Sequence, residues 1–382
     1  MLKSLQFRGF KALREVDLDD LPRLTVLVGP NGSGKTSVLE AIHYVAQLGT
    51  RPFCSIFNNH RDPKHLLRRG EDEPSVSLSG EWAGSEGNLT LTIEREVVNR
   101  PPPEEPLEGH KLKVNGSWGD QTYTTENDGE VLWNHLPDFG SEIARVVMLR
   151  LEASRLAKPS YSEQKVPRVE WNGYGLASVV GYMAGNQPER FKDLVQTLRR
   201  IVPVVEAVRV ERAEVHPPGE VSERVSRGGP GPGARRVWGE ELVFDMRGAP
   251  NLPAHAVSEG TLLTLGLLTV LFGPSTPRLV LLDDLDRTLH PQAQKTLVEV
   301  IRELLQATPD LQILATSHSP YLLDHLRHDE VRLTTLTPDG EALCAHLSEH
   351  PDFERWKELM TPGELWSSVG EQWLTQAGAK GA

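Results

Sequence analysis

Apolar runs and helical patterns alternate at the start of the chain. Residues 2–7 predict a first strand, Gly9 a turn, and Leu24–Val28 a second strand that is almost continuously apolar. Such a run is typical of a strand that is buried on both faces. Residues 36–46 follow with their apolar side chains along one helical stripe. The glycine-rich segment Gly29–Gly34 is therefore predicted as a loop between a strand and a helix.

From about Ser75 the pattern changes to alternation. Apolar residues at every second position predict an antiparallel sheet, with a turn at Gly84–Gly87. The RPPPEEP stretch that begins at Arg100 and the polar stretch Gln121–Gly129 are predicted as loops within this layer, because their composition is typical of turns.

Two helices and a second α/β section follow. The spacing of apolar residues predicts one helix around Leu176 and another from Pro188, which together form a helical hairpin. Residues 217–236 contain GGPGPG and are predicted as a flexible loop, because glycine and proline both oppose regular structure. From the helix at Ser258 onward, strands and helices alternate again. This alternation predicts a parallel sheet completed by distant segments.

Charge and hydropathy narrow the class of protein. The longest apolar runs are far shorter than a membrane span, and the N-terminus MLKSLQFRGF lacks the pattern of a secretory signal, which predicts a cytoplasmic protein without membrane contact. The formal net charge is −12, which argues against a surface that grips nucleic acid continuously, because phosphate contacts need a local excess of Lys and Arg. Any contact with nucleic acid would be local or conditional.

The segment GPNGSGKT at Gly29–Thr36 fits the pattern G-x-x-x-x-G-K-[ST]. Its glycines let successive backbone N–H groups converge on phosphate oxygens, and the following helix start adds partial positive charge. Lys35 is expected to reach the β- and γ-phosphates, and the Thr36 hydroxyl to bind Mg²⁺. The predicted phosphate-binding residues are Gly29, Asn31, Gly32, Ser33, Gly34, Lys35, Thr36 and Ser37. The alternative is a glycine-rich turn that binds nothing.

Two carboxylates follow the apolar run at Leu279–Leu282, where α/β sheets place ligands. Asp283 is expected to hold Mg²⁺, directly or through water. Asp284 stands where a general base could orient the attacking water. The alternative is a strand that ends in two solvated acids.

Two further segments carry polar residues at the ends of apolar elements. LATSHSP is a predicted strand that ends near His318, whose imidazole can donate a hydrogen bond to a γ-phosphate or to attacking water. In VSEGTLLTLGLL, Ser258 is predicted to cap an apolar helix and Gly260 to leave backbone exposed near its start, which would make an anion site. Taken singly, a histidine at a strand end is ordinarily structural, and the second segment is only a capped helix.

Together the four segments resemble the ABC ATPase heads of the RecF, SMC and OLD-like superfamily, and especially the stand-alone bacterial ATPases called AAA_21 or AAA_15. The resemblance implies an α/β fold: a two-lobed ABC-type P-loop ATPase head with an antiparallel β layer and an inserted α-helical module. It assigns the Walker A loop to Gly29–Thr36, the signature to Ser258–Thr261, the Walker B strand to Leu279–Asp283, the catalytic acid to Asp284 and the switch histidine to His318.

In this family two protomers sandwich ATP, so the resemblance implies an ATP-dependent homodimer or higher oligomer with Mg²⁺. Ser258 and Gly260 would then act on the nucleotide of the second copy. The expected division of the chain is 1–150 for an N-terminal lobe with the Walker A loop and the β layer, 151–250 for the helical insertion, 251–348 for a C-terminal lobe and 349–382 for a helical tail.

The chain departs from the family pattern in three places. The signature reads SEGT, without the paired glycines of transporters, and lies more than two hundred residues after Lys35, which suits a head with an inserted module. Most relatives have Glu where this chain has Asp284, which is one methylene shorter, so slow hydrolysis is expected. No glutamine is evident for the Q-loop, because the segment Val146–Arg155 offers Arg150 and Glu152 instead. That assignment stays open.

The leading functional hypothesis is an ATPase that acts as a conformational switch in DNA maintenance or antiphage defence, with an effector protein or nucleic acid as the partner. The alternatives are a non-hydrolysing, nucleotide-gated scaffold and a transporter ATPase subunit, whose usual signature is absent. Arg199–Arg236 is a candidate DNA contact or, with its interleaved acids, a solvated face. The aromatic residues of the tail, among them Phe353, Trp356 and Trp373, pack on the protein's own head or dock a partner.

Overall fold

The computed structural model describes residues 1–47, 66, 68, 73–98, 107–126, 136–215 and 237–378. The chain forms two compact units. The first comprises Met1–Met148, Arg278–Asp286 and Leu305–Ala382, and the second comprises Leu149–Pro277 and Arg287–Leu304. Both units combine segments that are distant in the chain. The sequence predicted a division of the chain into four consecutive parts. Because the two units are not consecutive in the chain, they do not test that division, and it stays a prediction.

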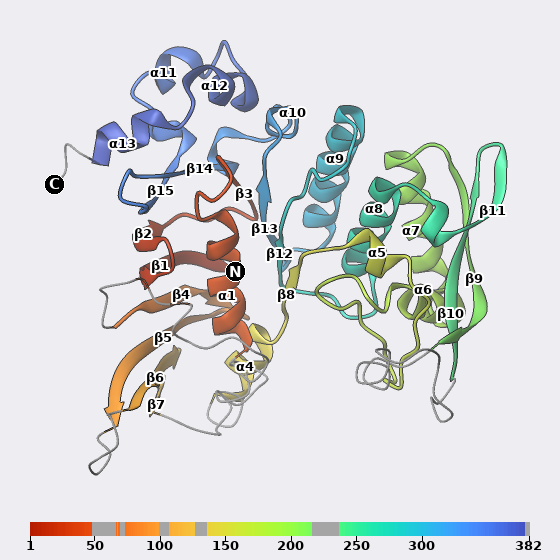
Figure 1. The fold of residues 1–382 in the computed structure, drawn as a ribbon, viewed down its shortest axis with the longest axis horizontal. Coiled ribbons are helices and arrows are strands. Elements are labelled where there is room, and N and C mark those ends of the chain that lie inside the picture. Colours follow the sequence, from red (N-terminus) through yellow and green to blue (C-terminus); the bar gives the residue numbers. More distant parts are fainter. Residues whose placement is uncertain are drawn as a thin grey trace. The chain divides into compact units, whose positions relative to one another are not determined.

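A mainly parallel sheet lies in the first unit (Figure 1). Its described strands, in spatial order, are β15 (Ala342–His346), β14 (Val331–Leu336), β3 (Leu24–Val28), β13 (Gln312–Ser317), β12 (Leu279–Leu282) and β8 (Val146–Leu149). Strand β13 pairs in parallel with β3 on one side and with β12 on the other. All residues of these three strands are buried, as their apolar runs predicted. Because they are parallel, their carboxyl ends meet at one edge of the sheet.

The predicted antiparallel sheet is also present in the first unit. Its described strands, in spatial order, are β2 (Leu13–Leu18), β1 (Leu2–Phe10), β4 (Ser75–Trp82), β5 (Ser85–Val98), β6 (Leu107–Trp118) and β7 (Gln121–Glu126). Helix α1 (Lys35–Gln47) contributes Val38, Leu39 and Ile42 to the core cluster that the buried residues of this sheet form. The helix that follows the phosphate-binding loop is thus held by buried apolar contacts.

Two local predictions in this sheet are wrong. Strand β1 continues through Gly9, which has φ 64°, and the turn comes only at Lys11 before β2. Residues 121–126 are strand β7 and not a loop, because Gly119 and Asp120 make a tight turn and the QTYTTE segment is rich in residues that favour strands. The predicted loops at 100–106 and 217–236, and residues 127–129, lie outside the described residues.

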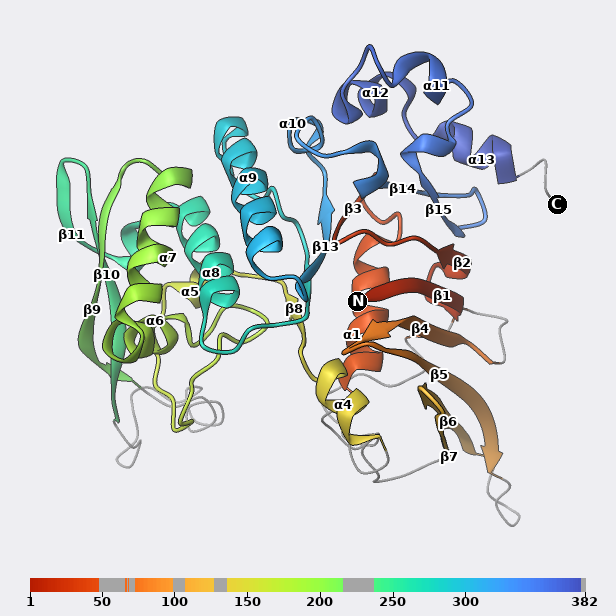
Figure 2. The ribbon, with the colours of Figure 1, turned by 180° about the vertical axis from the view of Figure 1, so that it is seen from behind.

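The second unit is built around helix α8 (Glu259–Phe272), which is buried along most of its length. The predicted helical hairpin is formed by α6 (Leu176–Asn186) and α7 (Pro188–Ile201), and both helices contact α8. Beside them lies a sheet of β9 (Val205–Val215), β10 (Val237–Met246) and β11 (Ala249–Pro253) (Figure 2). Short helices α5 (Ala153–Leu156) and η3 (Ala254–Ala256) also belong to this unit, and α9 (Pro291–Ala307) begins in it.

The C-terminal tail packs against the rest of the first unit, as one of the two interpretations of its sequence predicted. Leu365 is fully buried, the Thr361 hydroxyl donates a hydrogen bond to Asp324 at 2.5 Å, and the tail contacts β14 and β15. The remaining short helices of this unit are α4 (Pro137–Ile143), α10 (Pro320–Leu323), η4 (His328–Glu330), η5 (Leu347–Glu349), α11 (Phe353–Trp356), α12 (Pro362–Val369) and α13 (Gln372–Gly378). In the described part of the chain, no helix is long and apolar enough to cross a membrane.

Candidate nucleotide-binding site

The loop between β3 and α1 is held against strand β14. Gly29 is buried and has φ 150°, and a Cβ atom at this position would lie only 2.0 Å from the carbonyl oxygen of Thr334. The Thr334 hydroxyl donates to the carbonyl oxygen of Val28 at 3.1 Å and accepts a 2.6 Å hydrogen bond from the hydroxyl of Ser33. Only glycine fits this close backbone approach. Asn31 and Gly32 are exposed at the tip of the loop.

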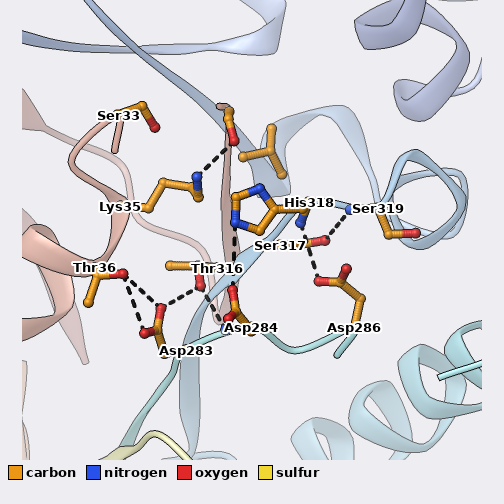
Figure 3. A network of polar contacts seen from close by, with 12 residues as sticks. Ser33, Lys35, Thr36, Asp283, Asp284, Asp286, Thr316, Ser317, His318 and Ser319 are labelled. Carbon is orange, nitrogen blue, oxygen red and sulfur yellow. Dashed lines mark hydrogen bonds and ion pairs between the residues drawn. The ribbon is translucent and has the colours of Figure 1, made fainter. Parts of the chain in front are cut away.

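Lys35 is buried under the loop, with its side chain folded back on the backbone (Figure 3). Its Nζ donates hydrogen bonds of 2.7 Å to the carbonyl oxygens of Gly29 and Pro30. Burial lowers the pKa of Lys35, whereas the carboxylates of Asp284 and Asp283 act in the opposite direction. An ammonium group has three protons, so a phosphate could accept one without displacing the loop.

Thr36 and Asp283 meet at the carboxyl edge of the parallel sheet (Figure 3). The Thr36 hydroxyl lies 3.1 and 3.3 Å from the two carboxylate oxygens of Asp283, and the hydroxyl of Thr316 donates to Oδ1 of Asp283 at 2.9 Å. Among the described residues no group of three or more His, Cys, Asp or Glu side chains could hold a metal ion. A hydroxyl and one carboxylate nevertheless suit Mg²⁺, which takes oxygen ligands and usually shares phosphate oxygens and water.

Asp284 and His318 also come together at this edge. The distance from Nε2 of His318 to Oδ1 of Asp284 is 3.6 Å, and both side chains are partly exposed. Asp284 has φ 58°, a left-handed conformation that is uncommon for residues other than glycine. The backbone N–H of His318 donates to the carboxylate of Asp286 at 3.3 Å. Lys35 and the side chains of the predicted metal ligand, catalytic acid and switch histidine therefore lie together in the first unit.

The predicted signature residues lie in the second unit. Ser258 is exposed and caps α8, with its Oγ accepting a 3.4 Å hydrogen bond from the backbone N–H of Thr261. Gly260 is buried in the first turn, where a Cβ atom would lie 2.8 Å from the carbonyl oxygen of Thr288. The capped helix is confirmed, whereas the expectation that Gly260 leaves backbone exposed is wrong, because this residue is packed against Thr288. A contact with the nucleotide of a second copy stays a prediction.

A known family matches the part of the chain that carries these elements. The family described as "AAA domain, putative AbiEii toxin, Type IV TA system" matches residues 24–324, which is more than half of the chain. The matched range includes the loop at Gly29–Thr36, Ser258, the aspartate pair and His318. The chain belongs to the AAA_21 family.

Curated relatives of this AAA_21 protein include proteins named DNA replication and repair protein RecF. The one from Corynebacterium jeikeium (strain K411) is 32% identical over 99 residues, which cover 26% of this chain and 22% of the relative. The one from Salinibacter ruber (strain DSM 13855 / M31) is 32% identical over 117 residues, which cover 31% of this chain and 24% of the relative. The chain thus spans about a quarter of the length of these relatives.

Solved SMC heads share the fold of the AAA_21 chain. The Smc head bound to the C-winged helix domain of ScpA has a TM-score of 0.56 and 15% identity, covering 92% of this chain and 99% of that chain. The Smc head with an extended coiled coil, bound to the C-terminal domain of ScpA derived from Pyrococcus furiosus, has a TM-score of 0.51 and 13% identity, covering 94% and 99%. The fold is α/β, that of an ABC-type P-loop ATPase head with antiparallel sheets.

Sequence reasoning missed three residues of the AAA_21 site, namely Thr316, Asp286 and Thr334. Each carried a weak signal. Thr316 is a polar residue within an otherwise apolar strand, Asp286 is the third acid of the DDLD segment, and Thr334 lies in strand β14, which was not predicted. The segment Val146–Arg155, in which no Q-loop glutamine was assigned, is partly paired through its backbone. The N–H groups of Arg150 and Glu152, in the second unit, donate to the carbonyl oxygens of residues 171 and 172.

Proposed function

We propose that this AAA_21 protein binds ATP with Mg²⁺ and hydrolyses it slowly, and that it acts as an ABC/SMC-like switch. One observation carries the proposal: the Thr36 hydroxyl, directly after the buried Lys35, lies 3.1 Å from Asp283, which arrives from a strand far along the chain. A loop that only turned the chain would need neither a buried ammonium nor a carboxylate beside its hydroxyl. Such an arrangement is typical of Mg²⁺–nucleotide binding.

Each residue has a definable task in this proposal. The loop N–H groups and Lys35 bind the phosphates, and Thr36 and Asp283 would hold Mg²⁺, which neutralises phosphate charge when bound. The Asp284 carboxylate accepts a hydrogen bond from the attacking water and orients it toward the γ-phosphate. The imidazole of His318, whose Nε2 lies 3.6 Å from Oδ1 of Asp284, donates a hydrogen bond to the γ-phosphate or to the attacking water. Ser258 and Gly260 of a second copy complete the site.

The biological setting is proposed from the names of the relatives. The curated relatives are named for DNA replication and repair, the solved heads were bound to domains of ScpA, and the family description includes a toxin of a type IV TA system. These names support a role in DNA maintenance or antiphage defence, with an effector protein or a local nucleic-acid contact. The homodimer or higher oligomer that forms with ATP is proposed from the resemblance of the four sequence segments to ABC ATPase heads.

Phosphate release tests the ATPase proposal. Replacement of Lys35 by Ala removes the buried ammonium, so we expect the rate to fall at least ~100-fold at high protein concentration. Lys192→Ala removes an exposed lysine of α7 and serves as the matched control, with an unchanged rate. Equal rates for the wild type and Lys35→Ala would contradict the proposed hydrolysis.

Oligomeric state tests the proposed dimer. Asp284→Asn keeps the shape of the side chain but removes the base, so ATP stays unhydrolysed and the closed pair accumulates. Light scattering after size exclusion should show twice the monomer mass with ATP and Mg²⁺, and monomer mass without nucleotide. A mass that is unchanged by ATP would contradict the dimer.

A second candidate function is a nucleotide-gated scaffold that does not hydrolyse ATP. The side chain of Asp284 is shorter than the usual glutamate, and its Oδ1 lies 3.6 Å from Nε2 of His318. If this contact holds the carboxylate away from the attacking water, ATP would bind and bring two protomers together without being hydrolysed. Tight ATP binding together with no phosphate release by the wild type would support the scaffold over the ATPase.

A further inference from the structure

Thr316 occupies a position from which it reaches three consecutive residues of the candidate site. It lies in β13, between β3 and β12, and is fully buried. In the parallel register Leu282, the last residue of β12, pairs with Ala315. Thr316 therefore faces the point where the chain leaves β12 and enters the aspartate pair.

Three hydrogen bonds connect Thr316 to this turn. Its hydroxyl donates to Oδ1 of Asp283 at 2.9 Å and accepts from the backbone N–H of Asp284 at 2.8 Å, as Figure 3 shows. Its carbonyl oxygen accepts from the backbone N–H of Leu285 at 2.9 Å. One residue thus touches the metal-ligand position, the catalytic-acid position and the residue after it.

The chemistry of a hydroxyl explains why a threonine suits this position. An amide N–H can only donate, so the Thr316 oxygen must accept from Asp284 and its single proton is left for the carboxylate of Asp283. Valine has the same shape but can do neither, which would leave a buried N–H without its partner. Serine keeps both bonds. The β-branched methyl group of threonine additionally suits the strand.

The bond to Asp284 has a second consequence, because Asp284 adopts φ 58°. A left-handed residue other than glycine is disfavoured and persists where its surroundings hold it. Here the N–H groups on both sides of the Asp284 Cα atom are held by one residue, through the hydroxyl and the carbonyl oxygen of Thr316. The direction in which the short Asp284 side chain leaves the backbone is therefore set by Thr316.

We propose that Thr316 is a positioning residue, which orients Asp283 toward the Mg²⁺ position and Asp284 toward the attacking water. The inference rests on the proposed function for its reaction, but its geometric part concerns Mg²⁺ binding alone. Thr316 also ties both aspartates to strand β13, which ends at Ser317, directly before His318. Replacing a residue that hydrogen-bonds a metal ligand, without binding the metal itself, typically lowers metal affinity by about 10- to 100-fold.

Substitution by Thr316→Val, with Thr316→Ser as the conservative variant, tests the proposal. Binding of a fluorescent ATP analogue is titrated with Mg²⁺, and phosphate release is measured separately. For Thr316→Val we expect the Mg²⁺ concentration for half-maximal binding to rise about 10-fold and kcat to fall about 10- to 100-fold, while binding without Mg²⁺ is unchanged. Thr316→Ser should stay within about 3-fold of the wild type in both.

Thr25→Val is the matched control, because Thr25 is equally buried in the neighbouring strand β3. Among the described residues, its hydroxyl reaches only the Pro22 carbonyl oxygen, at 3.5 Å. It should leave the Mg²⁺ titration unchanged. An unchanged Mg²⁺ requirement in Thr316→Val, or equal defects in the Val and Ser variants, would overturn the positioning role. If the wild type releases no phosphate, the ATPase proposal fails, and the Mg²⁺ titration still decides the role of Thr316.

Discussion

Helices α1 and α8 each begin with a glycine-containing segment, and their first turns are built differently. Before α1, the Ser33 hydroxyl is bonded to Thr334 of another strand, and Gly32 and Gly34 have positive φ. At α8, the Ser258 hydroxyl accepts from the Thr261 N–H of its own helix. The start of α1 is therefore held by a hydrogen bond to another strand. The start of α8, in contrast, is held by a hydrogen bond within its own first turn.

The difference indicates how each helix start can bind an anion. The loop before α1 has a buried ammonium and a carboxylate within its own unit, so in the proposed function it supplies the main contacts to the Mg²⁺–nucleotide. At α8 one N–H is already occupied by the cap, and Gly260 is buried against the Thr288 carbonyl oxygen. The exposed Ser258 can thus add to a nucleotide that is held elsewhere. This agrees with the proposed role in a second copy.

The largest expected effect that would sharpen this contrast comes from Gly29→Ala. Its Cβ atom would meet the Thr334 carbonyl oxygen at 2.0 Å, and φ 150° is unfavourable for alanine. We expect the free energy of unfolding to fall by about 3 kcal/mol or more and nucleotide binding to be lost. Urea denaturation and fluorescence titration with an ATP analogue measure the two effects.

Gly32→Ala is the matched control for Gly29. Gly32 has φ 81°, but no atom lies within 4 Å of the position that an added methyl carbon would take, so alanine meets only backbone strain. We expect a loss of about 1–2 kcal/mol. Equal losses in the two variants would show that the contact with β14 does not stabilise the loop.

Ser258 separates the cap from the proposed contact with a second copy. Ser258→Ala should lower the free energy of unfolding by about 1 kcal/mol, through loss of the N-cap. Ser258→Asp restores a good cap but places a negative charge where the phosphates of the partner's nucleotide would lie. The Asp variant should therefore be as stable as the wild type in thermal melting and slower than Ser258→Ala in phosphate release. Wild-type turnover by Ser258→Asp would contradict the contact.

The sequence predicts those parts of the site that depend on local pattern. The apolar run before Gly29, the helical stripe after it and the run before Asp283 are short-range signals, and parallel strands bring their carboxyl ends to one edge. Lys35, Thr36 and Asp283 were therefore expected together. The contact of Gly29 with Thr334 involves a strand about 300 residues later, and no local pattern reports it.

Thr316 was missed for a related reason. A threonine within a strand is common in any sheet, and its meaning here depends on the register that places Ala315 opposite Leu282. The left-handed backbone of Asp284 is likewise set by contacts with the neighbouring strand. Strand β7 was missed because its polar residues were interpreted as a loop, although pairing with β6 along Lys113–Trp118 satisfies its backbone. Partner strands, more than propensity, decide such elements.

A smaller effect is expected at the second glycine of the comparison. Gly260→Ala adds a Cβ atom 2.8 Å from the Thr288 carbonyl oxygen, which must shift. Alanine is also favoured over glycine inside a helix by about 1 kcal/mol, so the two effects partly cancel. We expect a net loss below about 1 kcal/mol by urea denaturation. A loss as large as that of Gly29→Ala would mean that the two helix starts are equally constrained.

The smallest effect concerns the buried cation that α1 has in its first turn. Burial lowers the pKa of Lys35 below its ordinary value of 10.5, against the opposing pull of Asp284 and Asp283. Between the folded pKa and 10.5 the unfolded chain binds more protons, so the free energy of unfolding rises with pH in this window. Below the window the cost of the buried charge is fully present.

Lys35→Met removes the charge, and the stability of the nucleotide-free wild type relative to this variant should therefore increase as the pH approaches 10.5. Urea denaturation at a series of pH values measures the difference, with the exposed Lys192→Met as a control that should show no such slope. A difference that is flat for Lys35 as well would mean that the ammonium is not desolvated.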